Sequence, residues 1–430
     1  MGRLRTMAVI RPFCGLRFDR ATGPLDDLIA PPYDVLSQAQ RDAYAAKNAH
    51  NIVALTLPEQ NPDDRSKFVK YARSSARLQE WRQSGAIKPE AQPAFYRYCQ
   101  KFQIPGTSKT LTRTAIIALL KVEPYEKGVV LPHEQTFPKH KEDRLRILEA
   151  TRAHLECIYG LFEDPYGAIH KMIVDAPAAE TAQATDEEGV TQSLEPITDP
   201  EAIQKITEAL ADRKVWIADG HHRYETAVNF RAMAGEREGL IAEDFMMMAL
   251  SSMSDPGLII LPTHRIVPKL PISIEVFDAK LRSVFEVHDV PNNDLMNRVE
   301  SLAGSDTRTI GIALKGGVGK LVTLAATDAA RRIPGDFSDE LKSLDVSILH
   351  NIIFEQLLGL TGLEFFSYTR VLEEALDAVN AGADAAFLMN PPTVDDMRII
   401  ALGGEKMPQK STYYYPKLMS GLVVWSLADF

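Results

Sequence analysis

The chain has 430 residues, of which 45% are hydrophobic and 25% charged, as in folded globular proteins with room for two packed domains. Its formal net charge of −10 opposes nonspecific binding to nucleic acid or to an anionic membrane, and no apolar run approaches the roughly 20 residues of a membrane span. The three scattered cysteines predict no disulfide framework, and the first residues contain no signal-peptide core, so we expect a cytoplasmic protein without nucleic-acid or membrane partners.

Strands and helices alternate in the first half. An apolar run at 51–57 predicts a strand, and near-helical spacing predicts a helix over 64–85 that Gly85 ends. The other predicted elements of this half are a strand at 8–13, a helix at 39–48, a β-hairpin of 94–104 and 111–122, a helix at 140–152, an exposed acidic excursion at 179–196, and a helix, strand and helix at 199–212, 214–218 and 221–234.

After about residue 235 the pattern changes. Two apolar runs, 244–255 and 257–267, share an Asp-Pro-Gly turn and predict a second hairpin. We therefore predict an α+β protein with mixed sheets, divided into 1–235 and 236–430, with the second portion packed against the first. The later predicted elements are helices near 273–284, 293–303, 345–360 and 371–381 and strands at 308–315, 319–325, 384–389 and 421–427.

Residues 315–320, KGGVGK, resemble the core of a phosphate-binding loop. Such a loop needs a following Ser or Thr whose hydroxyl binds magnesium, but Leu321 follows here, and both flanks have the pattern of strands. We therefore predict two strands joined at Gly316-Gly317 and a Lys320 side chain that contacts no nucleotide.

A stronger phosphate-binding candidate is VWIADGHHRYETA, residues 215–227. A helix that starts directly after a buried strand points backbone N–H groups and its positive dipole end at the edge of the sheet, which favours an anion. Gly220 allows close approach of a ligand, and the next three residues add donors and positive charge: His221, His222 and Arg223.

Two other interpretations of this turn stay open. Asp219 could simply be the N-cap of a solvated helix, although it could also orient a histidine or meet magnesium. The two histidines could bind a transition metal, but adjacent helical residues point about 100° apart, and the i, i+4 ligand spacing is absent.

Three further stretches carry candidate chemistry. The loop 132–144, PHEQTFPKHKEDR, offers Glu134 as a general base for a hydroxyl, with His133 and Thr136 as phosphate contacts; the alternative is an exposed charged loop. In APPYDVL two prolines stiffen the backbone around Asp34, a second candidate base, although this stretch could equally be a turn before a helix capped by Asp34 or Ser37. Near the end of the chain, MPQKSTYYYPKL offers three groups for an oxyanion: Lys410, Ser411 and Thr412.

Together, IADGHHRYETA, APPYDVL, HEQTFPKHKEDRL, GLIILPTHR and MPQKSTYYYPKL resemble, along nearly the whole chain, a microbial family catalogued as a domain of unknown function. Through DGHHR alone, that family is similar to the ParB/sulfiredoxin-like fold, in which this helix start holds nucleotide phosphates. Gly220, His222 and Arg223 match the Gly-x-His-Arg form of sulfiredoxins, but His221 replaces their cysteine, so sulfinate chemistry is not implied. Free-serine kinases share the fold and use a glutamate base, magnesium and nucleotide.

The resemblance and the residues together predict a nucleotide-dependent phosphotransferase that acts on a small hydroxyl-bearing metabolite, with ATP or ADP as donor and Mg²⁺ as cofactor. The portion 1–235 would bind the nucleotide, and we expect 219–223 and 133–140 to share one cleft. The alternatives are a nucleotide-binding switch or regulatory protein, and a hydrolase that uses the same phosphate site. The candidate bases are Glu134, Asp34 and Asp219, and the candidate phosphate contacts are Gly220, His221, His222, Arg223, His133, Thr136, Lys410, Ser411 and Thr412.

Overall fold

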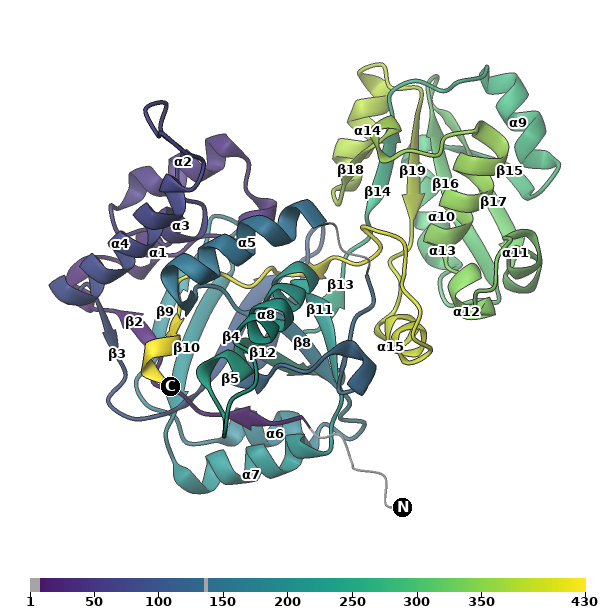
Figure 1. The fold of residues 1–430 in the computed structure, drawn as a ribbon. Helices are drawn as coiled ribbons and strands as arrows, with labels where there is room; N and C mark the ends of the chain where they lie inside the picture. Colours follow the sequence, from purple (N-terminus) through teal and green to yellow (C-terminus); the bar gives the residue numbers. More distant parts are fainter. Residues whose placement is uncertain (1–7, 135–137) are drawn as a thin grey trace. The chain divides into compact units, whose positions relative to one another are not determined.

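The computed structural model describes residues 8–134 and 138–430, and the chain divides into two compact units (Figure 1). The division differs from the expected boundary at residue 235, because the strand that follows this residue belongs to the sheet of unit 1. Among the described residues, unit 1 contains those up to Pro132, those from Pro138 to Leu258, and Pro416–Phe430, whereas unit 2 contains His133, Glu134 and Ile259–Tyr415.

In the described part of unit 1, nine strands form one mixed sheet in the order β6-β11-β8-β12-β5-β4-β10-β9, with β1 paired to β5. β11 runs parallel to β6 and β12 runs parallel to β8, whereas the other neighbours are antiparallel. This mixed sheet confirms the predicted α+β class. The strands are β1 (Ile10–Arg11), β4 (Phe95–Gln103), β5 (Thr110–Lys121), β6 (Val130–Leu131), β8 (Ile158–Phe162), β9 (Ala182–Thr185), β10 (Thr191–Ile197), β11 (Val215–Asp219) and β12 (Phe245–Ser252).

The first predicted hairpin is confirmed as β4 and β5, but the second is wrong. All residues of β12 are buried, and this strand pairs with β5 on one side and β8 on the other. Neither edge of β12 is therefore free to pair with the run 257–267. The strand ends at Ser252, and in the turn that follows the Asp255 carboxylate accepts the N–H groups of Thr114 and Gly257. The following run supplies β13 (Ile259–Ile260) and β14 (His264–Val267) of unit 2.

Two segments of unit 1 differ from their predicted structure. The run 51–57 forms a short helix, α3 (Val53–Thr56), because the Asn51 side chain accepts the N–H of Val53 and all four helical residues are buried. Burial here outweighs the β-propensity of the run. The predicted acidic excursion is the hairpin of β9 and β10, whose turn is closed by Asp186 through the N–H groups of Glu188 and Val190.

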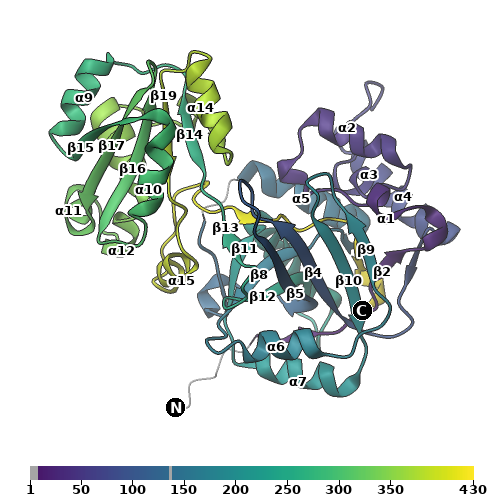
Figure 2. The same ribbon diagram turned by 180° about the vertical axis from the view of Figure 1, so that it is seen from behind.

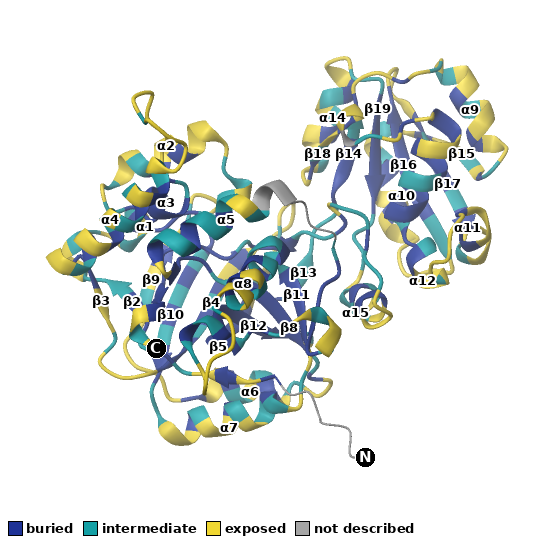
Figure 3. Cartoon of the chain, in the orientation of Figure 1, coloured by how far each residue is buried: buried dark blue, intermediate teal, exposed yellow. Residues whose placement is uncertain are grey.

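Helices pack against this sheet. α8 (His221–Met233) contacts β8, β12 and α5 (Pro138–Thr151), and Figures 1 and 2 together show it over one face. α6 (Ala168–Asp175) and α7 (Pro200–Ala211) pack against each other, α6 against β5 and β12, and α7 against β1. Buried apolar side chains from all three of α6, α7 and α8 join those of the strands in one core, which appears as the dark strands in Figure 3. The sheet therefore holds the start of α8 against a rigid layer.

Local sequence signals explain the helix ends of unit 1. Ser37 and Gln40 form a capping box at the start of α2 (Gln38–Lys47), so Ser37 is the cap rather than Asp34. Gly85, with φ of 77°, ends α4 (Val69–Ser84) as predicted. With α3 and α5, these helices enclose a second core beside β2 (Leu16–Phe18) and β3 (Ile87–Pro89).

In the described part of unit 2, six strands form a second sheet in the order β15-β17-β16-β19-β14-β18. The hairpin predicted around Gly316-Gly317 is confirmed, with φ of 104° and 85° at the two glycines, and Lys320 is paired with Asp278 and Asp289 at 3.0 and 2.6 Å. Besides β14, the strands are β15 (Glu286–Pro291), β16 (Thr307–Leu314), β17 (Val318–Ala325), β18 (Ser367–Thr369) and β19 (Ala385–Met389).

Alternate residues of β19 face the two sides of this second sheet. Leu388 packs in the core formed by α10 (Leu295–Ser301) and α14 (Leu372–Asn380). Phe387 instead contacts Phe277 of α9 (Ile274–Arg282) and Phe354 of the π-helix Ile348–Leu358, with ring centroids 6.4 and 4.9 Å away. The sheet thus lies between helices on both faces.

Among the residues that the structure describes, no helix has the length and apolarity that a membrane crossing requires.

The buried His154 gives unit 1 a testable pH dependence. Burial lowers the pKa of His154 to about 4, while its ring stacks on Trp425 with centroids 5.3 Å apart. The unfolded chain takes up this proton near pH 6.5, so stability is fully present above that pH and falls as the pH drops towards 4. His154→Phe keeps the stacking and removes the titration.

We therefore compare the unfolding free energy of wild type with that of His154→Phe. As the pH is lowered from about 6.5 to 4, the wild-type value should fall relative to that of the variant by up to about 1.4 kcal/mol per pH unit. Urea unfolding followed by tryptophan fluorescence measures it, because all three tryptophans, Trp81, Trp216 and Trp425, lie in unit 1. A difference that stays constant across this range would contradict the assignment.

Candidate functional site

The predicted strand-to-helix junction is present at the end of β11. Gly220 precedes α8 with φ of 94°, a left-handed conformation that favours glycine, and no side chain caps the first turn of the helix. A Cβ atom at this position would lie 3.0 Å from Nη2 of Arg223, so the guanidinium would have to shift by a few tenths of an ångström to admit a side chain. The interpretation of Asp219 as the helix N-cap is wrong, because its carboxylate contacts side chains instead.

Asp219 is held between two cations. Nζ of Lys417 donates a hydrogen bond of 2.8 Å to Oδ1, and Nη2 of Arg223 lies 3.4 Å from Oδ2. Burial alone would raise the pKa of Asp219, but the charges of Lys417 and Arg223 hold it below its usual range. A carboxylate with so low a pKa is a weak proton acceptor, so the geometry favours a positioning role for Asp219 over its predicted role as a base.

Arg223 points into unit 1 rather than towards solvent. Its Nη1 donates to the carbonyl oxygen of Cys157 at 2.8 Å, and only 11% of its side chain is exposed. Burial would lower the pKa of this guanidinium, but the carboxylates of Glu156, Asp219 and Asp34 raise it above the ordinary value. Arg223 therefore anchors the turn, a role that the sequence analysis did not anticipate.

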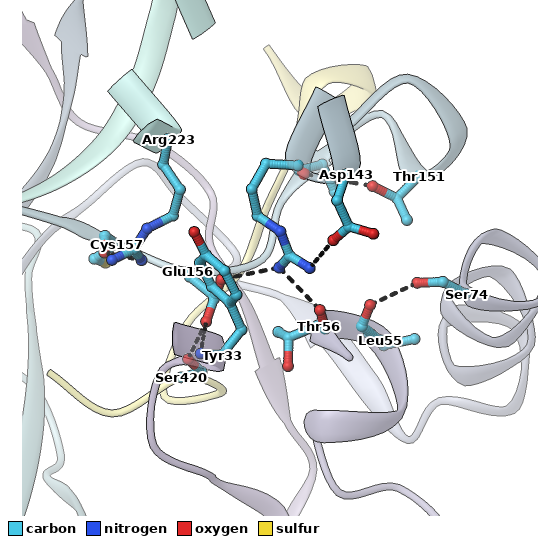
Figure 4. A network of polar contacts seen from close by, with 12 residues as sticks. Tyr33, Leu55, Thr56, Ser74, Asp143, Thr151, Glu156, Cys157, Arg223 and Ser420 are labelled. Atoms are coloured by element: carbon cyan, nitrogen blue, oxygen red, sulfur yellow. Dashed lines mark hydrogen bonds and ion pairs between the residues drawn. The ribbon is translucent and has the colours of Figure 1, made fainter. Parts of the chain in front are cut away.

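Tyr33 and Glu156 connect this turn to two other stretches (Figure 4). The guanidinium carbons of Arg144 and Arg223 lie 3.8 and 5.8 Å from the centre of the Tyr33 ring. The Glu156 carboxylate accepts the N–H of Tyr33 at 3.2 Å and the hydroxyl of Ser420 at 2.9 Å, and it lies 3.7 Å from Nη1 of Arg144. The side chains of Arg144, Glu156 and Arg223 line a small cavity of about 50 Å³.

A second group of predicted residues meets in unit 2. Nε2 of His133 lies 2.9 Å from Oγ1 of Thr412, and the Glu134 carboxylate accepts the N–H of Lys410 at 3.0 Å. Lys410 has φ of 57°, unusual for a residue with a side chain, and its carbonyl accepts a hydrogen bond of 3.1 Å from Arg265. Residues 133–134 and the stretch PQKST, far apart in the chain, are therefore neighbours.

The predicted residues fall into two groups, one in each unit. Thr136 lies outside the described residues, so its predicted role has no structural counterpart here. The expectation of one cleft shared by 219–223 and 133–140 concerns both units and stays a prediction. Unit 1 holds Asp34, Asp219, Gly220, His221, His222 and Arg223, and unit 2 holds His133, Glu134, Lys410, Ser411 and Thr412.

Two residues of the site were missed from the sequence. Lys417 belongs to the quoted YYYPKL stretch, but nothing in the pattern connects it with Asp219, 198 positions earlier. Glu156 follows a short strand without any motif, and only its burial between two arginines identifies it.

In 8–134 and 138–430, no group of three or more His, Cys, Asp and Glu side chains could hold a metal ion. Magnesium that is carried by nucleotide phosphates needs only one or two protein carboxylates. In unit 1, the carboxylates of Asp34 and Asp219 both act on Arg223 at the turn, so either fits that requirement.

The fold and the turn thus define an α+β chain with mixed sheets, in which a helix without a side-chain cap starts directly after a buried strand. It matches the model "Protein of unknown function (DUF1015)" over residues 10–347 and belongs to this family, which confirms the predicted membership. None of the curated proteins matches the chain.

Solved structures that are similar to it at low identity include the following three. A free serine kinase variant in complex with ADP is 13% identical, with 67% of this chain and 84% of the kinase covered and a TM-score of 0.35. A conserved hypothetical protein from Pyrococcus furiosus is 13% identical (70% and 94% covered, TM-score 0.34), and SbnI with a C-terminal truncation from Staphylococcus aureus is 11% identical (73% and 88% covered, TM-score 0.36). Such TM-scores establish neither a shared fold nor a shared activity.

Arg223→Met should destabilise unit 1 by roughly 3 kcal/mol, because removal of the guanidinium leaves Glu156 and Asp219 without their shared buried partner. Tryptophan-detected urea unfolding measures the change. The same substitution at the exposed Arg237, in the loop after α8, is the matched control and should cost less than about 0.5 kcal/mol. Equal stability of the two variants would show that Arg223 is not the anchor described here.

Proposed function

We propose that this protein is a nucleotide-dependent phosphotransferase that acts on a small hydroxyl-bearing metabolite, and that the nucleotide phosphates bind at the start of α8. The observation that carries the proposal is the turn itself: a buried strand, a left-handed glycine and a helix start without a side-chain cap. Backbone N–H groups and the helix dipole favour an anion at such a position.

The charges around the turn support an anionic ligand there. Lys417 and Arg223 lie on either side of Asp219, so the negative charge of this carboxylate is already compensated. Half-buried His222 in the first helical turn supplies a further side chain at the same end of α8. Gly220 presents no side chain, so a phosphate could approach the backbone closely.

Phosphoryl transfer requires mainly positioning and charge neutralisation, which such a site can supply. Magnesium bound with the nucleotide would neutralise charge on the phosphates, and Asp34 or Asp219 would hold it. The substrate hydroxyl needs a base, for which Glu134 and Asp34 remain the candidates. The resemblance to free-serine kinases supports a serine-like acceptor, and a nucleotide-binding switch remains the second candidate.

Gly220→Ala should weaken ATP or ADP binding at least about tenfold, because the added methyl group strains a φ of 94° and displaces Arg223. Isothermal calorimetry with magnesium present measures the affinity. Gly167→Ala is the matched control, since Gly167 also precedes a helix of unit 1 with positive φ but has open space around it. Equal nucleotide affinity of both variants and wild type would exclude the start of α8 as the phosphate site.

Glu134→Gln should lower phosphoryl transfer by about 10²–10⁴-fold and leave nucleotide affinity largely unchanged, because the amide keeps the size of the side chain but cannot accept a proton. Nucleotide consumption with serine and other small hydroxyl compounds measures turnover, and calorimetry measures binding. Asp34→Asn is the parallel variant. Full activity of Glu134→Gln with loss in Asp34→Asn would assign the base to Asp34, whereas full activity of both, and of Asp219→Asn, would favour the nucleotide-binding switch.

A further inference from the structure

Unit 2 contains a polar cavity of about 330 Å³ at one edge of its sheet. β14 and β16 begin at this edge and β19 ends there, since Arg265 pairs with Phe387 and Ile310 pairs with Met389. The loop after α10, the residues before the π-helix and the loop after β19 complete its walls. The volume lies at the lower end of the range for small-molecule sites.

Arg265 brings an uncompensated positive charge to this cavity. The residue is only 1% exposed, and its guanidinium donates to the carbonyl oxygens of Thr263 and Lys410. Within the described part of the chain, no carboxylate forms an ion pair with Arg265, and its buried Nε has no hydrogen-bond partner. Burial lowers the pKa of this guanidinium to about 10. A buried charge of this kind is costly unless an anion accompanies it.

Asp345 lines the same cavity and brings a carboxyl group to it. Burial raises the pKa of its carboxyl group to about 7; Arg308 opposes this effect and Asp396 adds to it. Two neighbouring polar atoms, Nε of Arg308 and Oγ1 of Thr309, are buried without hydrogen-bond partners, and both residues line the cavity. Native proteins seldom leave so many polar groups unsatisfied at one place unless a ligand or water completes them.

We propose that this cavity binds a small zwitterion of the size of an α-amino acid, with its carboxylate on Arg265 and its ammonium group on Asp345. A purely anionic ligand would face the carboxylates that also line the cavity, and a purely cationic ligand would leave Arg265 uncompensated. The charged groups of the lining include Arg265, Arg308, Asp306, Asp345 and Asp396. The inference concerns unit 2 alone, so it does not depend on nucleotide binding in unit 1.

The test is a calorimetric titration of the full chain with each of the twenty standard L-amino acids at up to about 10 mM, with propionate and ethylamine as probes of one charge each. We expect at least one amino acid to bind, and each single-charge probe to bind at least about tenfold more weakly. Absence of binding by every amino acid would overturn the proposal. Propionate that binds as tightly as the best amino acid would replace it with a plain anion site.

Two variants test the residues. Arg265→Met and Asp345→Asn should each weaken the bound amino acid by about tenfold or more, while the same changes at exposed positions of unit 2, Arg331→Met and Asp377→Asn, should not. Asp345→Asn is the decisive variant if Arg265→Met does not fold. This substitution removes a carboxyl group whose ionised form burial disfavours. Near neutral pH, the variant should therefore unfold at a temperature no lower than that of wild type. Unchanged affinity in Asp345→Asn would contradict the proposed ammonium contact.

Discussion

The buried guanidinium of Arg223 connects the parts of unit 1 that meet where β11 becomes α8. It reaches back from the first helical turn to the carbonyl oxygen of Cys157, directly before β8, and to the Asp219 carboxylate at the end of β11. A buried cation and buried carboxylates are each unfavourable alone, so each keeps the other in place. The same guanidinium lies close to Gly220, whose φ of 94° favours glycine, so a side chain there would also press on Arg223.

The residues that support this turn come from four distant parts of the chain. Tyr33 follows two prolines, Arg144 lies on α5, Glu156 precedes β8, and Lys417 comes from the segment after unit 2. Their hydrogen bonds and ion pairs fix the backbone at the start of α8 before any ligand arrives. Preorganisation of this kind favours anion binding, because no binding energy is then used to order the backbone of the site.

The sequence predicts the regular elements well where local signals are strong. The capping residues of α2, the hairpin of β4 and β5, and the Gly-Gly turn between β16 and β17 all carry their information within a few residues. The failures at 51–57 and at β12 have a different cause. An apolar run shows that a segment is buried, but whether it becomes a helix or an interior strand depends on partners far away in the chain.

The same limit applies to the candidate sites. The motif around Gly220 was recognisable because a strand, a glycine and a helix are consecutive. The pairing of residues 133–134 with PQKST joins two stretches already chosen for their polarity. Arg265 and Asp345 carry no motif, and only the burial of Arg265 and the cavity that both residues line distinguish them from other charged residues. Burial of a charge is a property of the folded chain, so composition and spacing do not reveal it.

The return of Pro416–Phe430 to unit 1 has a consequence for the order in which the protein is assembled. This segment supplies Lys417 to Asp219, the Ser420 hydroxyl to Glu156 and the Trp425 ring beside His154. A ribosome delivers it only after all of unit 2, so unit 2 can complete its fold while unit 1 still lacks Trp425 and the Lys417 cation. Until Pro416–Phe430 emerges, a nascent chain would therefore have a complete unit 2, whereas Asp219 would still lack the ammonium group of Lys417.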